Sequence, residues 1–234
     1  MKKTERLISI IVPVFNEAKT ILKVLQKLSE IRKFGYSFEV IVVNDGSTDN
    51  TNQILSENNS LIDKQIDNET NSGKGYSVKK ALEIAEGKYI IFQDADLEYD
   101  PNDFIKFFKL IEKFDPDLII GSRFVYAEYT RSHYFLNKMG NRMITLLFNL
   151  IYNTTFTDIY SCYACFKREL LNVKLLKTEG FEQHAEILCK VVIRGKKFYE
   201  VPINYNGRSH EEGKKIKFYH IFPVIFQILI GRFF

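Results

Sequence analysis

Apolar runs rich in β-branched residues alternate with amphipathic segments along the first half of the chain. The runs LISIIVPV at residues 7–14 and FEVIVV at 38–43 contain almost no polar side chains, which is typical of parallel strands covered on both faces. Between them, apolar residues recur at helical spacing from residue 18 to 31. The alternation predicts β-α-β units with right-handed crossovers, and therefore an α/β fold with helices on both faces of a mostly parallel sheet.

The same alternation continues along the rest of the chain. Further strands are expected at residues 61–66, 89–93, 118–121 and 198–203. Further helices are expected to end near residues 57, 86, 114, 152 and 194. We assign no strand to the apolar stretch that ends at Phe166.

Length and composition are those of one globular unit. With 234 residues, 45% hydrophobic and 26% charged, the chain can bury a sizeable core, so a disordered chain and a polytopic membrane protein are not expected. The net charge of +4 decides nothing by itself, and no nucleic-acid partner is expected. Residues 1–6 show no signal-peptide pattern, so we expect a cytoplasmic protein with free, buried thiols.

The carboxyl-terminal tail, residues 218–234, is strongly apolar but has only 17 residues, and a membrane span needs about 20. It is interrupted by Pro223, Gln227 and Arg232. The lysines that precede the tail and can meet anionic headgroups are Lys214, Lys215 and Lys217. We expect the tail to lie along the membrane interface, and the alternatives are packing on the body or a partner, and insertion.

Acidic residues stand where three of the predicted strands end. The segment FQDADLEYDP places Asp94, Asp96 and Glu98 at alternate positions after a buried strand. Alternate residues of an extended segment point the same way, so these carboxylates can converge on one hard cation, Mg²⁺ or Mn²⁺. Glu17 and Asp45 follow two other strands, and ligands of such sheets bind beyond the carboxyl ends of the strands. The plain alternative is a solvated acidic turn.

Four further motifs accompany this segment along the chain: VPVFNE, VNDGSTD, NSGKG and GSR. Together they resemble the motifs of family 2 glycosyltransferases with the GT-A fold, and within that family the dolichol-phosphate mannosyltransferase and polyprenyl-phosphate glycosyltransferase group. The resemblance covers residues 7–215. It implies a Rossmann-like glycosyltransferase domain at 1–217, with a nucleotide-sugar half at about 1–122 and an acceptor half at about 123–217, followed by the tail.

The resemblance assigns roles to residues that bind the donor. It implies that Pro13 and Glu17 line a nucleoside pocket and that Asp45 contacts the base or the ribose. Lys74 in NSGKG is placed to meet the donor phosphate, and Asp94 lies at the same donor site. Structural readings stay open, because a proline needs no ligand to end a strand and an aspartate can close a turn.

Catalytic residues are implied in the acceptor half. Arg123 in GSR matches a position that faces the acceptor, and Asp158 in the TD element matches one near the reacting centre. Arg208 and Lys215 fall in a segment, NGRSHEEGKKI, that looks like the family loop closing over the donor and acceptor phosphates. The structural alternatives are a helix cap or an arginine partner for Asp158, and a solvated basic loop for the other segment.

Two positions depart from the family pattern. Ala164 stands where a lysine is expected, and Gly213 is followed by two lysines without the serine of a GxSK-like pattern. Glu186 matches a family glutamate on the helix behind the reacting centre, where a structural ion pair is the alternative. The departures bear mainly on the acceptor.

The resemblance implies an inverting, metal-dependent transfer from a nucleoside-diphosphate sugar to a polyprenyl phosphate. The cation neutralises the leaving diphosphate, which then needs no proton. A phosphate acceptor is already ionised near neutral pH, whereas a sugar hydroxyl needs a base, for which Asp158 is the candidate. A lipid acceptor implies a peripheral protein at the cytoplasmic face of the membrane, and an oligomer is compatible with the sequence.

Three competing functions are considered. A transferase to a saccharide hydroxyl in surface-polysaccharide synthesis has the same fold, and competition by water-soluble sugars distinguishes it. A catalytically silent nucleotide-sugar-binding protein is disfavoured by the intact acidic cluster. A nicotinamide-dependent oxidoreductase is disfavoured because no GxGxxG follows the first strand.

Overall fold

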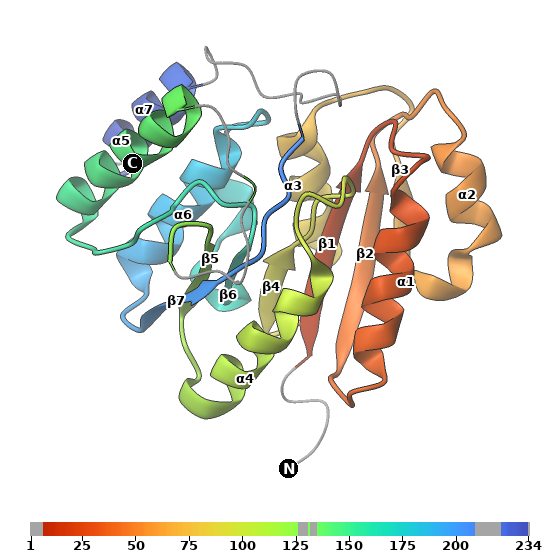
Figure 1. Cartoon of the computed structure of the whole chain (residues 1–234). Helices are drawn as coiled ribbons and strands as arrows, with labels where there is room; N and C mark the ends of the chain where they lie inside the picture. The colour runs from red at the N-terminus through yellow and green to blue at the C-terminus, as the bar shows by residue number, and fades with distance from the viewer. Residues whose placement is uncertain (1–6, 126–130, 132–134, 209–220, 234) are drawn as a thin grey trace.

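One central sheet organises the molecule (Figure 1). The structure is a computed structural model that describes residues 7–125, 131, 135–208 and 221–233. Its strands are β1 (Ile8–Val14), β2 (Phe38–Asn44), β3 (Lys64–Asp67), β4 (Tyr89–Phe92), β5 (Leu118–Ser122), β6 (Ala164–Lys167) and β7 (Phe198–Pro202). Within the described residues they form a seven-stranded sheet in the order β3-β2-β1-β4-β6-β5-β7. The predicted α/β class with a mostly parallel sheet is confirmed.

Pairing in the sheet is parallel except at β6. β1 pairs in parallel with β2 and β4, so Ile11 lies between Ile41 and Phe92. β5 and β7 are also parallel, whereas β6 runs antiparallel to its neighbours β4 and β5. The sequence pattern predicts no strand at β6, and this prediction is wrong. β6 has only four residues, and periodicity cannot distinguish so short an apolar run from other buried structure.

Helices cover both faces of the sheet, as the sequence pattern predicts. The helices are α1 (Ile21–Arg32), α2 (Thr51–Glu57), α3 (Lys74–Ile84), α4 (Phe104–Phe114), α5 (Phe135–Tyr152), α6 (Gln183–Arg194) and α7 (Ile221–Ile230). In Figure 1, α1 and α4 lie in front of the strands and α3 and α6 lie behind them. The buried residues of α1 recur at helical spacing, which is why this helix can be predicted.

The carboxyl-terminal helix α7 packs on α5 and α6. Its buried side includes Val224 and Ile228, and the Tyr152 hydroxyl donates a hydrogen bond to the Ile228 carbonyl at 3.1 Å. The tail therefore packs on the body through one of its sides, which matches one of the alternatives for it. Among the described helices, none is long and apolar enough to cross a membrane.

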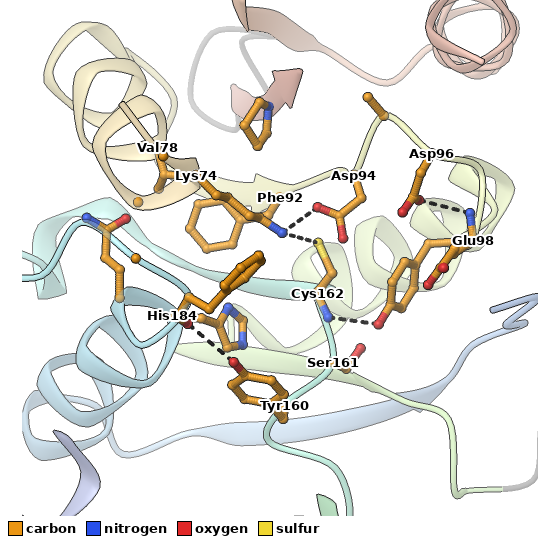
Figure 2. A pocket seen from close by; sticks show the side chains of 18 of the residues that line it. Lys74, Val78, Phe92, Asp94, Asp96, Glu98, Tyr160, Ser161, Cys162 and His184 are labelled. Carbon is orange, nitrogen blue, oxygen red and sulfur yellow. Dashed lines mark hydrogen bonds and ion pairs between the residues drawn. The ribbon is translucent and has the colours of Figure 1, made fainter. Parts of the chain in front are cut away.

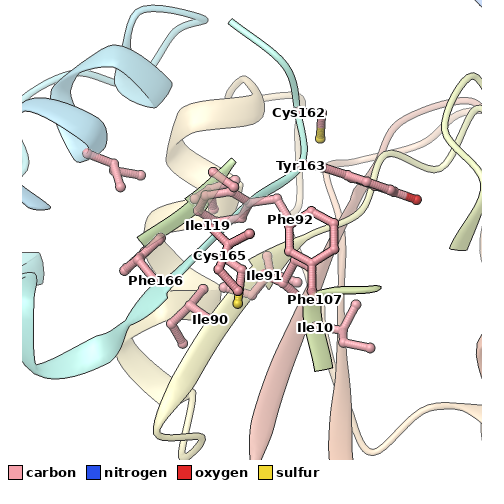
Figure 3. Close-up of a cluster of buried hydrophobic side chains, with 14 of the residues drawn as sticks. Ile10, Ile90, Ile91, Phe92, Phe107, Ile119, Cys162, Tyr163, Cys165 and Phe166 are labelled. Carbon is pink, nitrogen blue, oxygen red and sulfur yellow. The ribbon is translucent and has the colours of Figure 1, made fainter. Parts of the chain in front are cut away.

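The core beneath the site is formed where β4 and β6 meet (Figure 3). Phe92 and Phe166 lie with their ring centroids 5.9 Å apart, and Cys165 of β6 is fully buried. The Tyr163 hydroxyl and Gln93 Oε1 share a buried hydrogen bond of 2.6 Å. All three cysteines of the chain are free and buried, as expected. This packing holds the ends of β4 and β6 in place. Pocket residues such as Phe92, Asp94 and Cys162 lie at or next to these ends.

Candidate active site

A pocket of about 640 Å³ lies beyond the carboxyl ends of β1, β2 and β4. This is where ligands of parallel α/β sheets bind, and the volume is typical of small-molecule sites. The sequence-predicted residues that line it are Pro13, Glu17, Asp45, Lys74, Asp94, Asp96, Glu98, Arg123 and Arg208. Asp158 lies behind the lining, and Lys214 and Lys215 fall outside the described residues.

Lys74 and Asp94 form an ion pair inside the pocket (Figure 2). The Lys74 Nζ atom lies 2.5 Å from Asp94 Oδ1 and 4.0 Å from the sulfur of Cys162. Burial by itself raises the pKa of a carboxyl group, but the Lys74 ammonium holds the pKa of Asp94 below its ordinary value. Burial also opposes a charged lysine, yet Asp94 raises the pKa of Lys74. Both groups are therefore charged near neutral pH.

Asp96 has a less favourable environment for its charge. Its Oδ1 atom accepts a hydrogen bond from the Glu98 backbone N–H at 3.0 Å. Burial, together with the charges of Asp94 and Glu98, raises the pKa of Asp96 to about 7. A cation beside this carboxylate would offset both effects.

Glu98 directs its carboxylate to the segment that follows β7. One oxygen accepts from the Tyr205 hydroxyl at 2.8 Å, and the other accepts from the Arg208 backbone N–H at 2.7 Å. In the described part of the chain, no group of three or more His, Cys, Asp or Glu side chains is placed to hold a metal ion. The structure therefore does not form the expected three-carboxylate group. The donor set that fits Mg²⁺ or Mn²⁺ is Asp94 and Asp96, since such ions need only one or two carboxylates when substrate phosphates complete the shell.

Asp45 organises the loop that precedes α3. Its Oδ1 atom accepts from the Ser72 N–H at 3.0 Å, and its Oδ2 atom accepts from the Gly73 N–H at 2.8 Å. The side-chain amide of Asn68 donates a further bond of 2.7 Å. The carboxylate is almost fully buried, although it lines the pocket. Asp45 thus positions the loop that carries Lys74.

Arg208 joins the end of β1 to the end of β4. Its guanidinium pairs with both oxygens of Glu17, at 3.1 and 2.9 Å, and donates to the Asp96 carbonyl at 2.7 Å. Glu17 lies 191 residues earlier in the chain. The Arg208 guanidinium lines the pocket, where diphosphate oxygens can compete with Glu17 for its N–H groups.

Arg123 and Asp158 form a bidentate ion pair. The Nε and Nη2 atoms of Arg123 lie 2.7 and 2.8 Å from the two carboxylate oxygens, and the Arg123 backbone N–H also donates to Asp158 at 3.0 Å. Asp158 is fully buried. The structural alternative for Asp158, an arginine partner, is therefore what the structure shows. Both oxygens are occupied, so Asp158 is poorly placed to act as a base.

Glu186 has a structural position as well. Its carboxylate accepts hydrogen bonds from the backbone N–H groups of Lys177 and Thr178 at 3.0 to 3.1 Å, and the Thr178 hydroxyl donates another of 2.7 Å. These bonds fasten the segment before α6 to the first turns of that helix. Glu186 does not line the pocket.

Several pocket residues escape sequence reasoning. They are Tyr99, Asn137, Asn141, Tyr160, Cys162 and His184. Asn137 and Asn141 are one helical turn apart, and that spacing is a signal which could have found them. Tyr160 and Cys162 precede the antiparallel strand β6, which the sequence pattern also misses.

The chain matches known proteins over most of its length. The family model described as "Glycosyl transferase family 2" matches residues 9–173. Glycosyltransferase AglJ of Haloferax volcanii is 33% identical over 206 residues, which are 86% of this chain and 63% of that protein. The dolichol-phosphate mannosyltransferase of Pyrococcus furiosus is 26% identical over 88% of this chain and 58% of its own length. The chain thus spans about three fifths of these two relatives.

A solved structure has the same fold. Glucosyl-3-phosphoglycerate synthase from Mycobacterium tuberculosis, in complex with Mn²⁺, UDP and glucosyl-3-phosphoglycerate, aligns with a TM-score of 0.71 over 98% of this chain and 81% of that chain, at 20% identity. At that identity the likeness shows the fold, which is the GT-A fold expected from the motifs. Because the family model matches more than half of the chain, from β1 to β6 and including the acidic segment after β4, the chain belongs to glycosyl transferase family 2.

Proposed function

We propose that this glycosyltransferase moves a sugar from a nucleoside-diphosphate sugar to a polyprenyl phosphate at a membrane surface. We assign the nucleoside to the end of the pocket where Pro13 and Asp45 line it, at the ends of β1 and β2. Lys74, Asp94 and Asp96 mark the diphosphate end. The structural relative holds Mn²⁺ and UDP in a chain of the same fold, and the Pyrococcus relative is named for a lipid-phosphate acceptor.

The proposed reaction is a single displacement with inversion. A phosphate oxygen of the acceptor forms a bond to the anomeric carbon while the bond from that carbon to the diphosphate oxygen breaks, and the diphosphate takes the electron pair. Asp94 and Asp96 would hold Mg²⁺ or Mn²⁺, which supplies charge neutralisation to the leaving diphosphate. Lys74 and Arg208 bring further positive charge to the leaving group, and Arg123 orients the acceptor.

The pair between Arg123 and Asp158 favours a phosphate acceptor over a sugar hydroxyl. A hydroxyl loses its proton to a base during attack, and Asp158, the candidate base, has both oxygens bound to Arg123. A phosphate is already ionised and needs no base. The site as built therefore suits an anionic acceptor.

The observation that carries the acceptor assignment is the position of helix α5. One side of α5 lines the pocket through Asn137, Gly140, Asn141 and Ile144. Its other side exposes Met139, Met143, Leu146 and Leu150, the last of them 73% exposed. Helix α7 packs beside α5 and exposes Phe222, Phe226 and Leu229. We name these seven exposed side chains the α5–α7 apolar face.

The α5–α7 apolar face supports peripheral membrane binding. Large apolar side chains that recur along one side of a helix are typical of helices that lie in the membrane interface. Lys138 and Arg142 are exposed on α5 and can meet anionic headgroups. Because α5 also lines the pocket, a lipid phosphate held at this surface is close to the donor. The cytoplasmic face, where nucleotide sugars are available, is the proposed location.

Transfer assays test the proposal directly. The chain is mixed with Mn²⁺, one labelled donor at a time (UDP-glucose, UDP-N-acetylglucosamine or GDP-mannose), and undecaprenyl phosphate in phospholipid vesicles. We expect label in the lipid extract with at least one donor, and no loss of that signal when soluble saccharides are added. Label that moves only to a soluble saccharide would assign the enzyme to polysaccharide synthesis instead.

A further inference from the structure

His184 has an unusual nitrogen in the pocket. Its Nε2 atom is buried, and among the described side chains it is the buried nitrogen or oxygen atom without a hydrogen-bond partner. The residue stands in the first turn of α6 and lines the pocket (Figure 2). Buried polar atoms are almost always paired, so an unpaired one inside a pocket marks a place where a ligand atom can bind.

The imidazole ring is held in one orientation. The Ile159 backbone carbonyl acts on the ring as a hydrogen-bond acceptor and raises the pKa of His184, which favours a proton on Nδ1 because Nε2 has no partner. The rings of Phe92 and Tyr160 meet the imidazole edge-on, with centroids 6.3 and 6.1 Å away. The proton is thereby placed on Nδ1, and the lone pair of Nε2 remains for a ligand.

The charge state of His184 selects the chemistry of that ligand. Burial and then the neighbouring Lys74 ammonium lower the pKa of His184 to about 4, so the ring is neutral near neutral pH. A neutral imidazole whose Nδ1–H is already engaged can only accept a hydrogen bond. Phosphate oxygens and carboxylates have nothing to donate, whereas a hydroxyl or an amide N–H does.

The place of His184 in the pocket indicates which hydroxyl. The nucleoside end lies at Pro13 and Asp45, and the proposed diphosphate position lies at Lys74 and Asp94. His184 is on the far side of Lys74, next to Tyr160 and Cys162 in Figure 2. The group attached to the diphosphate on that side is the transferred sugar.

We propose that His184 Nε2 accepts a hydrogen bond from a hydroxyl of the transferred sugar and thereby helps to select the donor. This inference rests on the proposed function. It makes His184 a specificity-determining residue that contacts the sugar rather than the nucleotide.

Ligand-induced thermal shifts separate the sugar from the nucleotide. The wild-type chain and His184→Phe are measured with Mn²⁺ and UDP or GDP, and then with UDP-glucose, UDP-N-acetylglucosamine and GDP-mannose. Phenylalanine keeps a flat ring of similar size but has no acceptor. We expect the diphosphate to raise the melting temperature of the variant as it does that of the wild type. The further increase that the sugar gives should be lost, and the affinity of the variant for the sugar nucleotide should be about tenfold weaker. His184→Gln places an acceptor near the Nε2 position and should regain part of that affinity.

Each outcome decides one claim. The role of His184 is overturned if the sugar adds the same increase in melting temperature in the wild type and in His184→Phe. It is also overturned if sugar nucleotides raise the melting temperature of the wild type no more than their diphosphates do. A wild-type chain that responds to neither UDP nor GDP would contradict the proposed function itself. Positional deoxy analogues of the best donor add a second readout. The wild type should discriminate against one analogue about tenfold, and His184→Phe should not.

Discussion

At the scale of single residues, pairing decides which charges a ligand can use. Asp158 and Glu98 are fully engaged by Arg123, Tyr205 and the Arg208 backbone. Asp96 has one backbone bond, and burial together with its two acidic neighbours raises its pKa. A cation can stabilise the ionised form of Asp96, because it offsets the repulsion from the neighbouring carboxylates.

Replacing either carboxylate of the proposed metal site should abolish metal-dependent donor binding. We expect Asp94→Asn and Asp96→Asn to lower transfer by about 100-fold or more, because the leaving diphosphate loses its neutralising charge. Circular dichroism and the melting temperature should stay close to those of the wild type. Transfer at the wild-type rate in both variants would show that the metal site is elsewhere.

The raised pKa of Asp96 predicts a pH dependence of metal binding. The group is largely protonated below its pKa of about 7, and a cation requires the ionised form. The affinity for Mn²⁺ in the presence of UDP should therefore increase as the pH rises from about 6 to about 8. Calorimetric titration of Mn²⁺ into the wild type at these pH values measures it. A flat profile in the wild type would contradict the assignment.

Removing the Asp158 charge should reduce stability. Asp158→Asn leaves the buried Arg123 guanidinium without its counter-charge, which costs about 3–5 kcal/mol and lowers the melting temperature by about 10 °C. The double variant with Arg123→Met should recover part of the loss, because no unpaired charge remains. If Asp158→Asn keeps the wild-type melting temperature but the pH dependence of its transfer rate is lost, Asp158 acts as a base instead.

At the scale of elements, the α5–α7 apolar face gathers large exposed apolar side chains on two neighbouring helices. Its side chains are exposed although α5 and α7 pack on each other and on α6. Cutting the chain before α7 is a poor test of membrane binding, since Val224 and Ile228 are buried against the body and their loss would expose core surface. Substitutions on the exposed side avoid this problem.

We expect Met143→Glu with Leu146→Glu to weaken binding to phosphatidylglycerol vesicles by about tenfold or more, because two apolar contacts are replaced by charges that anionic lipid repels. Vesicle flotation measures the effect. Phe34→Glu, at a side chain 67% exposed outside this face, is the matched control and should float like the wild type. If the double variant floats normally but changes a dimer into a monomer, a second copy of the chain covers the face.

At the scale of the whole molecule, the sheet brings distant segments to one edge. Glu17 follows β1, Asp96 follows β4 and Arg208 follows β7, and the Arg208 guanidinium contacts both of the other segments. The side chains around the proposed phosphate position therefore depend on the order of the strands. The contacts among these side chains form only when the chain is folded.

Arg208→Ala should weaken engagement of the diphosphate by about tenfold or more, because a charge-assisted bond to a phosphate is lost. Steady-state kinetics with the productive donor would show it as a rise in KM or a fall in kcat/KM. Arg194→Ala is a suitable control, since Arg194 is exposed on α6 and does not line the pocket. If the two variants have equal kinetic constants, Arg208 does not bind the diphosphate, and the alternative of a solvated basic loop is supported.

The sequence by itself determined the alternating α/β pattern and the acidic and basic side chains of the pocket lining. Apolar runs, helical spacing and polar clusters at strand ends are local patterns, so they identify β1, β2 and β4 and place Glu17, Asp45, Asp94 and Asp96 at one edge. Only the tertiary structure decided how those charges pair. It introduced β6, occupied Asp158 and Glu98 with neighbours, and turned His184 into the pocket. Such contacts join residues far apart in the chain, and no local spacing carries their distances.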